Sequence, residues 1–278
     1  MSAELQNGLE ALPARYRPLF DRVRSVFEDD ERVRAMWMHG AIARGAADAG
    51  SDLDVDIAVA DEHFNAFTAE WQTWLAKITD TVSAVPIPGM AGSFYALTPT
   101  CERLDVITES VSGLPSSSLT RRLVVFDRDE LSELVPAPDD PPPDRGLMRH
   151  LLEEPLRQAA NFPAVLVRED WLLGVVAVQQ IHQYLYLLFA EANKPQPPTG
   201  PKQWSFKLAP AHRRMLESLP VPQPTRDSVL AARRAALAML FTEGPRIAAD
   251  HSVEWPTALA EAVRTFLERE GLPVNNAS

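Results

Sequence analysis

Residues 37–59 read Trp-Met-His-Gly-Ala-Ile-Ala-Arg-Gly-Ala-Ala-Asp-Ala-Gly-Ser-Asp-Leu-Asp-Val-Asp-Ile-Ala-Val, and this stretch decides the fold. Residues 33–38 are apolar at alternate positions, which predicts a strand that ends before Gly40. A short segment of small residues, 41–47, follows. The stretch then becomes apolar at alternate positions again, so a second strand is predicted at its end.

Three aspartates lie on one face of this second strand. Residues two apart in a strand point to the same side, so Asp52, Asp54 and Asp56 project together. Strands disfavour Asp, and adjacent carboxylates repel one another. A divalent cation such as Mg²⁺, which binds carboxylate oxygens, offsets that repulsion. A solvated face of an edge strand is the alternative, but the upstream glycines stand where a phosphate would need them.

The spacing of these motifs resembles the DNA polymerase beta-like nucleotidyltransferase superfamily, whose pattern is Gly-Ser, a short helix, then Ser-Asp-x-Asp. The resemblance covers roughly twenty residues, and two separated halves at the right distance are more specific than a lone Asp-x-Asp. The matching segments are Gly40-Ala41, Ala43-Arg44-Gly45 and Ser51-Asp52-Leu53-Asp54.

The resemblance implies an α/β nucleotidyltransferase fold, with a mixed sheet flanked by helices, and two Mg²⁺ ions that bridge acids and a nucleoside triphosphate. Asp52 and Asp54 would be metal ligands and catalytic residues. In such proteins the short helix after the glycine points its amides at the phosphates. The nucleotide-binding residues implied by the resemblance are Gly40, Ala41, Arg44, Ser51 and Lys202.

A third acid is expected on a later strand. Asp105 stands alone among apolar residues in the predicted strand 103–107. In the family, a third carboxylate on a later strand lies beside the first two and accepts the proton from, or helps to orient, the attacking hydroxyl. The resemblance therefore implies that Asp105 is catalytic and a third metal ligand. A hydrogen-bonded aspartate or an aspartate of an edge strand is the alternative.

Two residues depart from the family pattern. Ala41 stands where the family has Ser, so a hydroxyl that would hold the triphosphate is missing. Asp56 is an additional acid where the family is apolar, which leaves open which pair binds metal; Asp52 and Asp54 are preferred.

The composition is that of an acidic globular protein. The chain has 278 residues and a net charge of −11, which argues against a nucleic-acid partner and favours a cationic small molecule. The single Cys101 excludes a disulfide framework. The apolar run 175–190 is interrupted by glutamines and a histidine, so no membrane span is predicted. Without a signal peptide, a cytoplasmic protein is expected.

Proline-rich segments divide the chain. We predict a catalytic domain over 1–135, a linker over 136–146, and a helical bundle for substrate binding or dimerisation over 147–278. One helix is expected over 62–78 with its aromatic residues in the core, and a long helix over 169–192 in the centre of the bundle. Arg233 and Arg234 are expected at the surface.

Several side chains of the second domain are candidates for the site. His182 and Tyr186, four residues apart, share a helical face and line the site or are buried with hydrogen-bond partners. Lys202, with Lys207 in reserve, follows a Pro-rich loop resembling one that carries a triphosphate-binding lysine in small-molecule nucleotidyltransferases. The acids Glu153, Glu154, Glu169 and Asp170 are expected to meet a cationic acceptor, or else to favour helix N-termini.

The sequence thus indicates Mg²⁺-dependent transfer of a nucleoside monophosphate, AMP from ATP, to a hydroxyl of a small molecule. The two-domain layout resembles aminoglycoside and lincosamide nucleotidyltransferases, which implies an antibiotic acceptor and a role in resistance. Two alternatives stay open: a toxin-like enzyme acting on protein or tRNA, and a degenerate nucleotide-binding module. The oligomeric state is open, a homodimer included.

Overall fold

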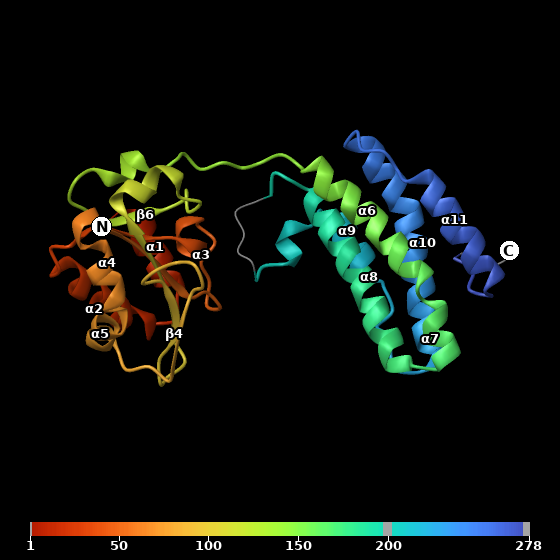
Figure 1. Ribbon diagram of the computed structural model, residues 1–278, viewed down its shortest axis with the longest axis horizontal. Helices are drawn as coiled ribbons and strands as arrows, with labels where there is room; N and C mark the ends of the chain where they lie inside the picture. Colours follow the sequence, from red (N-terminus) through yellow and green to blue (C-terminus); the bar gives the residue numbers. More distant parts are fainter. Residues whose placement is uncertain (1, 197–201, 275–278) are drawn as a thin grey trace. The chain divides into compact units, whose positions relative to one another are not determined.

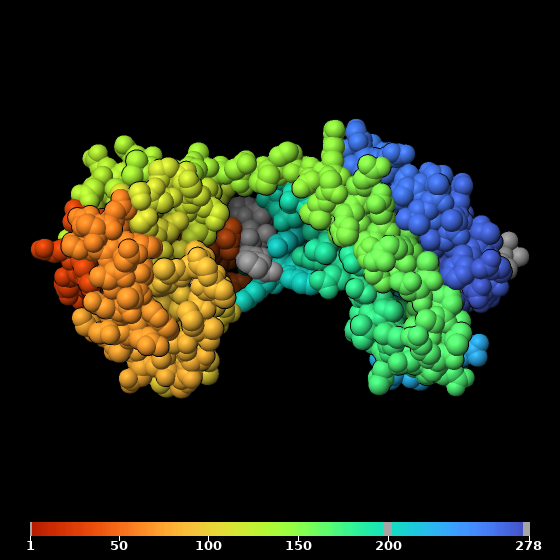
Figure 2. All heavy atoms as spheres, in the orientation of Figure 1, coloured from red at the N-terminus to blue at the C-terminus, as the bar shows by residue number. Residues whose placement is uncertain are grey.

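The computed structural model describes residues 2–196 and 202–274, which form two compact units (Figure 1). The first contains the described residues up to Asp139 together with Lys202, and the second contains 140–196 and 203–274. The chain passes from one to the other inside the segment 136–146, which the sequence analysis assigns to a linker. Figure 2 shows all heavy atoms of each unit as spheres.

The first unit is built on a mixed six-stranded sheet in the order β3-β4-β5-β2-β1-β6. β2 and β5 pair in parallel, while the other neighbours are antiparallel. The two central strands are therefore β5 and β2, each of which has a neighbouring strand on both sides. The strand bounds are β1 Val33–Met38, β2 Leu53–Val59, β3 Ser83–Pro86, β4 Phe94–Leu97, β5 Arg103–Ser110 and β6 Leu123–Asp127.

Helices cover one face of this sheet. Alternate residues of β2, from Leu53 to Val59, are fully buried against side chains of α1, α2, α4 and α5. The opposite face carries the aspartates and a smaller core around Trp37, with two short 3₁₀ helices. The bounds are α1 Ala3–Ala11, α2 Tyr16–Glu28, α3 Gly40–Ala43, α4 Asp61–Ala69, α5 Trp71–Ile78, η1 Val111–Ser116 and η2 Leu131–Leu134.

The aromatic stripe of 62–78 lies in the core as expected, but the single predicted helix is wrong. Glu70 separates α4 from α5, and the break lets both helices turn their apolar faces onto the sheet. Trp74 stacks on Phe67 with ring centroids 5.3 Å apart and contacts Phe94 of β4 at the same distance. α1, which the sequence analysis did not predict, packs against α3.

The second unit is a bundle of helices in which α8 packs against α6 and α10. By length and composition alone, α8 could cross a membrane. The central helix of a helical bundle meets the same two criteria. The structure thus confirms the predicted fold class: a mixed sheet flanked by helices, followed by a helical region. The bounds are α6 Arg145–Ala160, α7 Pro163–Arg168, α8 Trp171–Ala192, η3 Ser205–Lys207, α9 Pro210–Glu217, α10 Arg226–Asp250 and α11 Thr257–Arg269.

One expectation about this unit is wrong. Arg233 does not face solvent: it is 1% exposed, and its guanidinium lies 4.7 Å from the centre of the Phe162 ring. Burial lowers the pKa of Arg233 to about 10. An arginine can be buried in this way because its planar cation stacks on aromatic faces.

Candidate active site

The three predicted acids meet where β2 and β5 lie side by side. In the parallel register, Asp54 is paired with Asp105. Paired residues of neighbouring strands project to the same face of a sheet. Asp52 precedes the first residue of β2 and lies on the same side as Asp54, two positions on. Two segments that are distant in the sequence, 52–54 and 105, thus contribute carboxylates to the same face of the sheet, where β2 and β5 pair.

Asp105 is the most perturbed of these acids. Burial, followed in effect by the nearby Asp54 and Asp52 carboxylates, raises its pKa from 3.8 to about 6, against the opposing effect of Arg103. Its Oδ1 is buried and has no hydrogen-bond partner within 2–196 and 202–274. A carboxylate with a raised pKa and an unused oxygen is suited to accept a proton or to bind a cation.

Two cations reach this cluster. Arg103 lies two residues before Asp105 on the same face of β5, and its Nη1 and Nη2 are 3.0 Å from Asp52 Oδ2 and 3.3 Å from Asp105 Oδ2. Lys202 Nζ lies 2.5 Å from Asp52 Oδ2. The sequence analysis proposed Lys202 but missed Arg103, although the two-residue spacing from Asp105 was a usable signal.

Gly40 is required by the close approach of Asp54. Its φ is +64°, and a Cβ added there would lie 1.7 Å from Asp54 Oδ2. The amide of His39 also donates to the carbonyl of Asp54, at 3.0 Å. The turn and the acid are therefore packed as one piece. α3 itself covers only Gly40–Ala43, so the expected helix is a single turn.

The remaining predicted residues fall into different environments. Ser51 accepts from the amide of Asp48 at 3.0 Å and its hydroxyl donates to the same residue's carboxylate, so it shapes the loop before β2. Ala41 belongs to α3 beside Gly40. Arg44 follows α3 as a half-buried residue whose pKa burial lowers, and Asp54 is the nearby charge that opposes this effect.

Asp56 is separated from the other acids by burial. It is 0% exposed and its Oδ2 lies 2.5 Å from Nη1 of Arg122. The same guanidinium lies 2.6 Å from Glu109 and 4.9 Å from the centre of the Trp37 ring. Burial raises the pKa of Asp56 well above its usual value, with Arg122 opposing the shift. We conclude that Asp56 is part of a buried ion pair, which leaves Asp52 and Asp54 as the two partly exposed acids of this segment.

The donor set fits Mg²⁺ in its chemistry. Asp52, Asp54 and Asp105 offer hard oxygen ligands, and the unpartnered Oδ1 of Asp105 is an atom that a cation would satisfy. However, among the residues that the structure describes, no group of three or more Asp, Glu, His or Cys side chains is arranged to hold a metal ion. Arg103 and Lys202 are the cations that balance the carboxylates here.

Three of the four candidate acids of the second unit, Glu153, Glu154 and Asp170, have local partners, and Glu169 ends α7 as an exposed residue. Glu153 pairs with Arg149 at 3.2 Å, and Glu154 pairs with Arg157 at 2.6 Å. The carboxylate of Asp170 accepts from the amide of Leu173 and caps α8. For Asp170, the alternative of a helix N-terminal role is therefore the correct one.

The aromatic and imidazole candidates of α8 also separate. Tyr186 stacks on Trp204 with ring centroids 4.3 Å apart. His182 is partly buried, and its Nε2 has no hydrogen-bond partner in the described part of the chain. Burial lowers the pKa of His182, which favours the neutral imidazole.

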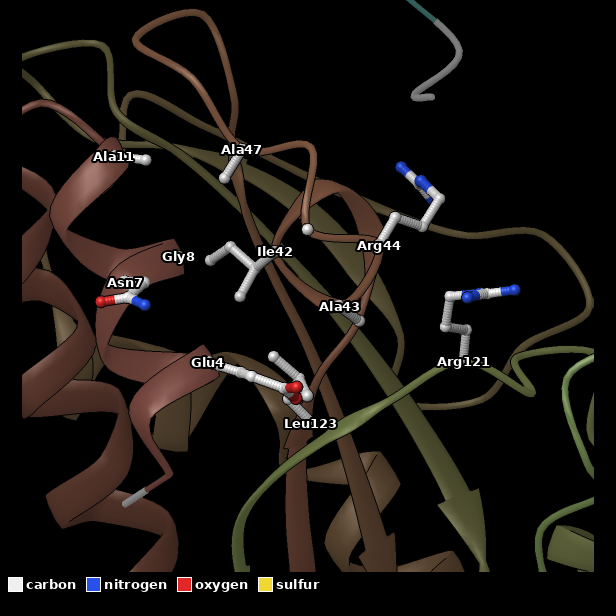
Figure 3. Close-up of a pocket in the computed structure, with 11 residues that line it drawn as sticks. Glu4, Asn7, Gly8, Ala11, Ile42, Ala43, Arg44, Ala47, Arg121 and Leu123 are labelled. Atoms are coloured by element: carbon white, nitrogen blue, oxygen red, sulfur yellow. The ribbon is translucent and has the colours of Figure 1, made fainter. Parts of the chain in front are cut away.

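A cavity of about 550 Å³ lies between α1 and the segment formed by α3 and the loop that follows it (Figure 3). Small residues form part of its wall, including Gly8 and Ala43, and Arg44 lies at one side. Arg121, from the segment that leads into β6, lies on the same side as Arg44. Sequence reasoning missed Arg121, which carries no motif.

No protein-family model matches the sequence, and a search among curated proteins also returns no match. Solved structures do resemble it. An aminoglycoside 6-adenyltransferase from Bacillus subtilis aligns over 98% of this chain and 99% of its own, with 13% identity and a TM-score of 0.44. A nucleotidyltransferase-like protein from Exiguobacterium sibiricum aligns over 91% of both chains, with 14% identity and a TM-score of 0.35.

A third structure, a cyclic dinucleotide synthase from Elizabethkingia meningoseptica, aligns over 97% of both chains with 10% identity and a TM-score of 0.28. At these identities and scores a shared chemistry does not follow from the likeness. The chemistry of the site is therefore inferred from its own residues: three convergent carboxylates, an interposed guanidinium and a lysine.

Proposed function

We propose that the protein transfers a nucleoside monophosphate, AMP from ATP, to a hydroxyl of a small amine-bearing molecule of the aminoglycoside or lincosamide antibiotic class. The observation that carries this proposal is the parallel register that pairs Asp54 with Asp105, with Asp52 on the same face. Mg²⁺, held by these three acids, would stabilise the attacking and leaving oxygens of an in-line displacement.

In this reaction the acceptor's hydroxyl oxygen forms a bond to the α-phosphorus, and the bond from that phosphorus to the bridging oxygen of the β-phosphate breaks. Pyrophosphate is the leaving group. Two observations support Asp105 as the proton acceptor. Its pKa of about 6 still leaves the carboxylate ionised at neutral pH, and its Oδ1 has no hydrogen-bond partner in the described part of the chain. Lys202 supplies a positive charge beside Asp52 that is suited to a phosphate oxygen.

The acceptor class is supported by charge. The net charge of −11 favours the approach of a cation and disfavours a polyanion such as tRNA. A hydroxyl-bearing amine meets both requirements: an oxygen to react and a positive charge to be attracted. Resistance to the modified antibiotic would follow from its nucleotidylation.

The test is mass spectrometry of an antibiotic panel incubated with the protein, Mg²⁺ and all four nucleoside triphosphates. The expected result is a mass gain of one nucleoside monophosphate on one panel member, with release of pyrophosphate, and no product from Asp54→Asn. A panel of aminoglycosides and lincosamides that stays unmodified, while nucleotide binds, would exclude the proposed acceptor class.

A nucleotide-binding module without transfer activity is the second candidate. It is favoured by two observations: Ala41 lacks the family's hydroxyl, and Arg103 pairs with two of the three carboxylates. Two measurements together separate the candidates: calorimetric titration with nucleotide and an assay for pyrophosphate. A binding module gives a titration signal but releases no pyrophosphate with any acceptor, whereas the transferase does both.

A further inference from the structure

One face of α8 is exposed and carries no charge. The buried side chains of this helix pack against α6 and α10 (Figure 1). Residues 171–190 contain no Asp, Glu, Lys or Arg, yet only 39% of the apolar stretch of α8 is buried. Six exposed side chains recur three or four positions apart or are neighbours, so they form one stripe along the helix. This uncharged face of α8 consists of Leu172, Val176, Gln179, Gln180, Gln183 and Leu187.

The apolar side chains of this face are exposed well beyond what packing in their own bundle requires. Leu172 is 72% exposed, Val176 57% and Leu187 38%. Single exposed apolar residues are common on soluble proteins, whereas aligned ones mark a surface that contacts something else. The uncharged face of α8 is therefore a candidate interface.

The order of side chains along this face is nearly the same in both directions. The midpoint lies between Gln179 and Gln180, and Leu172 precedes it by as many residues as Leu187 follows it. Two copies of α8 packed antiparallel about a twofold axis through this midpoint would place each leucine against the other leucine of the second copy. The glutamines would meet at the centre, where each amide can both donate and accept a hydrogen bond. A twofold interface requires a surface that is complementary to itself in this way.

The two ends of α8 carry opposite charge. Residues 168–170, one arginine followed by two acids, lead into the helix and carry one net negative charge. At the other end, the charged residues lining a pocket in the described part of the chain are Glu191, Lys194 and Lys207, with one net positive charge. Antiparallel packing brings the acidic end of each copy to the basic end of the other, and it opposes the two helix dipoles.

We propose that the uncharged face of α8 is the interface of a homodimer in which two copies of this helix pack antiparallel about a twofold axis. Two chains of net charge −11 repel each other, and a face without charges, with complementary ends, is where their approach costs least. A membrane surface matches less well, because helices that lie on membranes carry basic residues beside the apolar face. The dimer forms whether or not the site in the first unit transfers a nucleotide.

The size of the interface predicts a dimer that dissociates on dilution. The stretch from Leu172 to Leu187 spans about 22 Å, at 1.5 Å per residue of helix. One pair of helices over this length lies at the small end of specific interfaces, where complexes are weak. Sedimentation velocity of the full chain over a concentration series measures it, and we expect the sedimentation coefficient to rise from the monomer value towards the dimer value.

Val176→Glu tests the face itself. Val176 would lie opposite Gln183 of the other copy, and the twofold axis introduces the new carboxylate twice in each dimer. We expect the dissociation constant to rise at least about tenfold. Val221→Glu is the matched control, because Val221 is 74% exposed in the connection between α9 and α10 and receives the same substitution outside α8. Circular dichroism and thermal melting verify the fold of both variants.

Cross-linking through introduced cysteines tests the antiparallel orientation. Cys101→Ser is the background, since Cys101 is free and exposed. With a short bismaleimide, Gln180→Cys should give a cross-linked dimer, because position 180 lies beside the twofold axis. Leu172→Cys alone should not, because its two copies would lie about 22 Å apart along the helix pair. Combining Leu172→Cys with Leu187→Cys should restore the cross-link.

Three results overturn the proposed interface. The first is a chain that stays monomeric over the whole concentration series, as when the first unit of the same chain covers this face. The second is a dimer that Val176→Glu and Val221→Glu weaken equally, or one that Leu172→Cys alone cross-links. The third is a monomer that binds neutral or anionic lipid vesicles in a flotation assay and loses this binding in Val176→Glu, which would assign the face to a membrane.

Discussion

Asp105→Asn should stabilise the metal-free protein at neutral pH. The carboxyl of Asp105 has a pKa of about 6 in the folded protein against 3.8 in its ordinary state. The folded protein therefore holds this proton to a higher pH than the unfolded chain does. The free energy of unfolding falls as the pH rises from about 3.8 through 6, and the loss is complete above that window. A shift of about two units corresponds to about 3 kcal/mol.

Asn resembles the protonated carboxyl in shape and carries no charge, so it should escape this cost. Between pH 4 and pH 7.5 the stability difference between Asp105→Asn and the native protein should grow by about 3 kcal/mol, or roughly 6–12 °C in melting temperature. Chelator-treated samples, melted at a series of pH values, measure it. Added Mg²⁺ should reverse the order by stabilising the native protein more than the variant. A difference that stays flat with pH would refute the assigned environment of Asp105.

Four further outcomes follow from the site. Asp54→Asn should lower kcat by at least about a hundredfold with the circular dichroism spectrum unchanged, because it removes a metal-binding oxygen. Asp56→Asn should cost about 3 kcal/mol of unfolding free energy in denaturant titrations, because it leaves Arg122 with one buried partner fewer; a stability within experimental error of native would contradict that role. Ala41→Ser should tighten ATP binding about fivefold in calorimetry, since a neutral hydrogen bond contributes about 1 kcal/mol; weaker binding would speak against a phosphate near this residue. The KM of a cationic acceptor should rise with ionic strength above about 0.15 M, whereas a flat KM would argue for a neutral one.

The elements that position the acids could be predicted from local sequence. Strand β1 has the predicted bounds, and β2 lies at the end of the stretch 37–59 as predicted, although it begins after Asp52. Alternation of apolar and acidic residues determines both faces of β2, because one face must meet the helices. The partnership of Asp54 with Asp105 needed the family resemblance as well, since strand pairing across fifty residues has no local signature.

The parts that could not be predicted depend on contacts between distant residues. Alternation places Asp56 on the same face as Asp54, and only Arg122, far along the chain, makes one acid a buried ion-pair partner and leaves the other accessible. Arg233 is predicted at the surface because arginines are mostly exposed, yet its guanidinium lies over the Phe162 ring. Whether such an arginine or aspartate is buried depends on which distant residue it contacts in the folded protein. The neighbouring sequence does not indicate that contact.

The contact between Gly40 and Asp54 has a consequence for how this protein can change over generations. The acid occupies the volume that any side chain at position 40 would need, so a single added methyl collides with the carboxylate before it meets anything else. The two positions are therefore inherited as a unit: drift at the turn is blocked while the acid stays, and loss of the acid releases the turn. A lineage in which this glycine has been replaced should be one in which the aspartate has already gone, and with it the selection that kept the pair together.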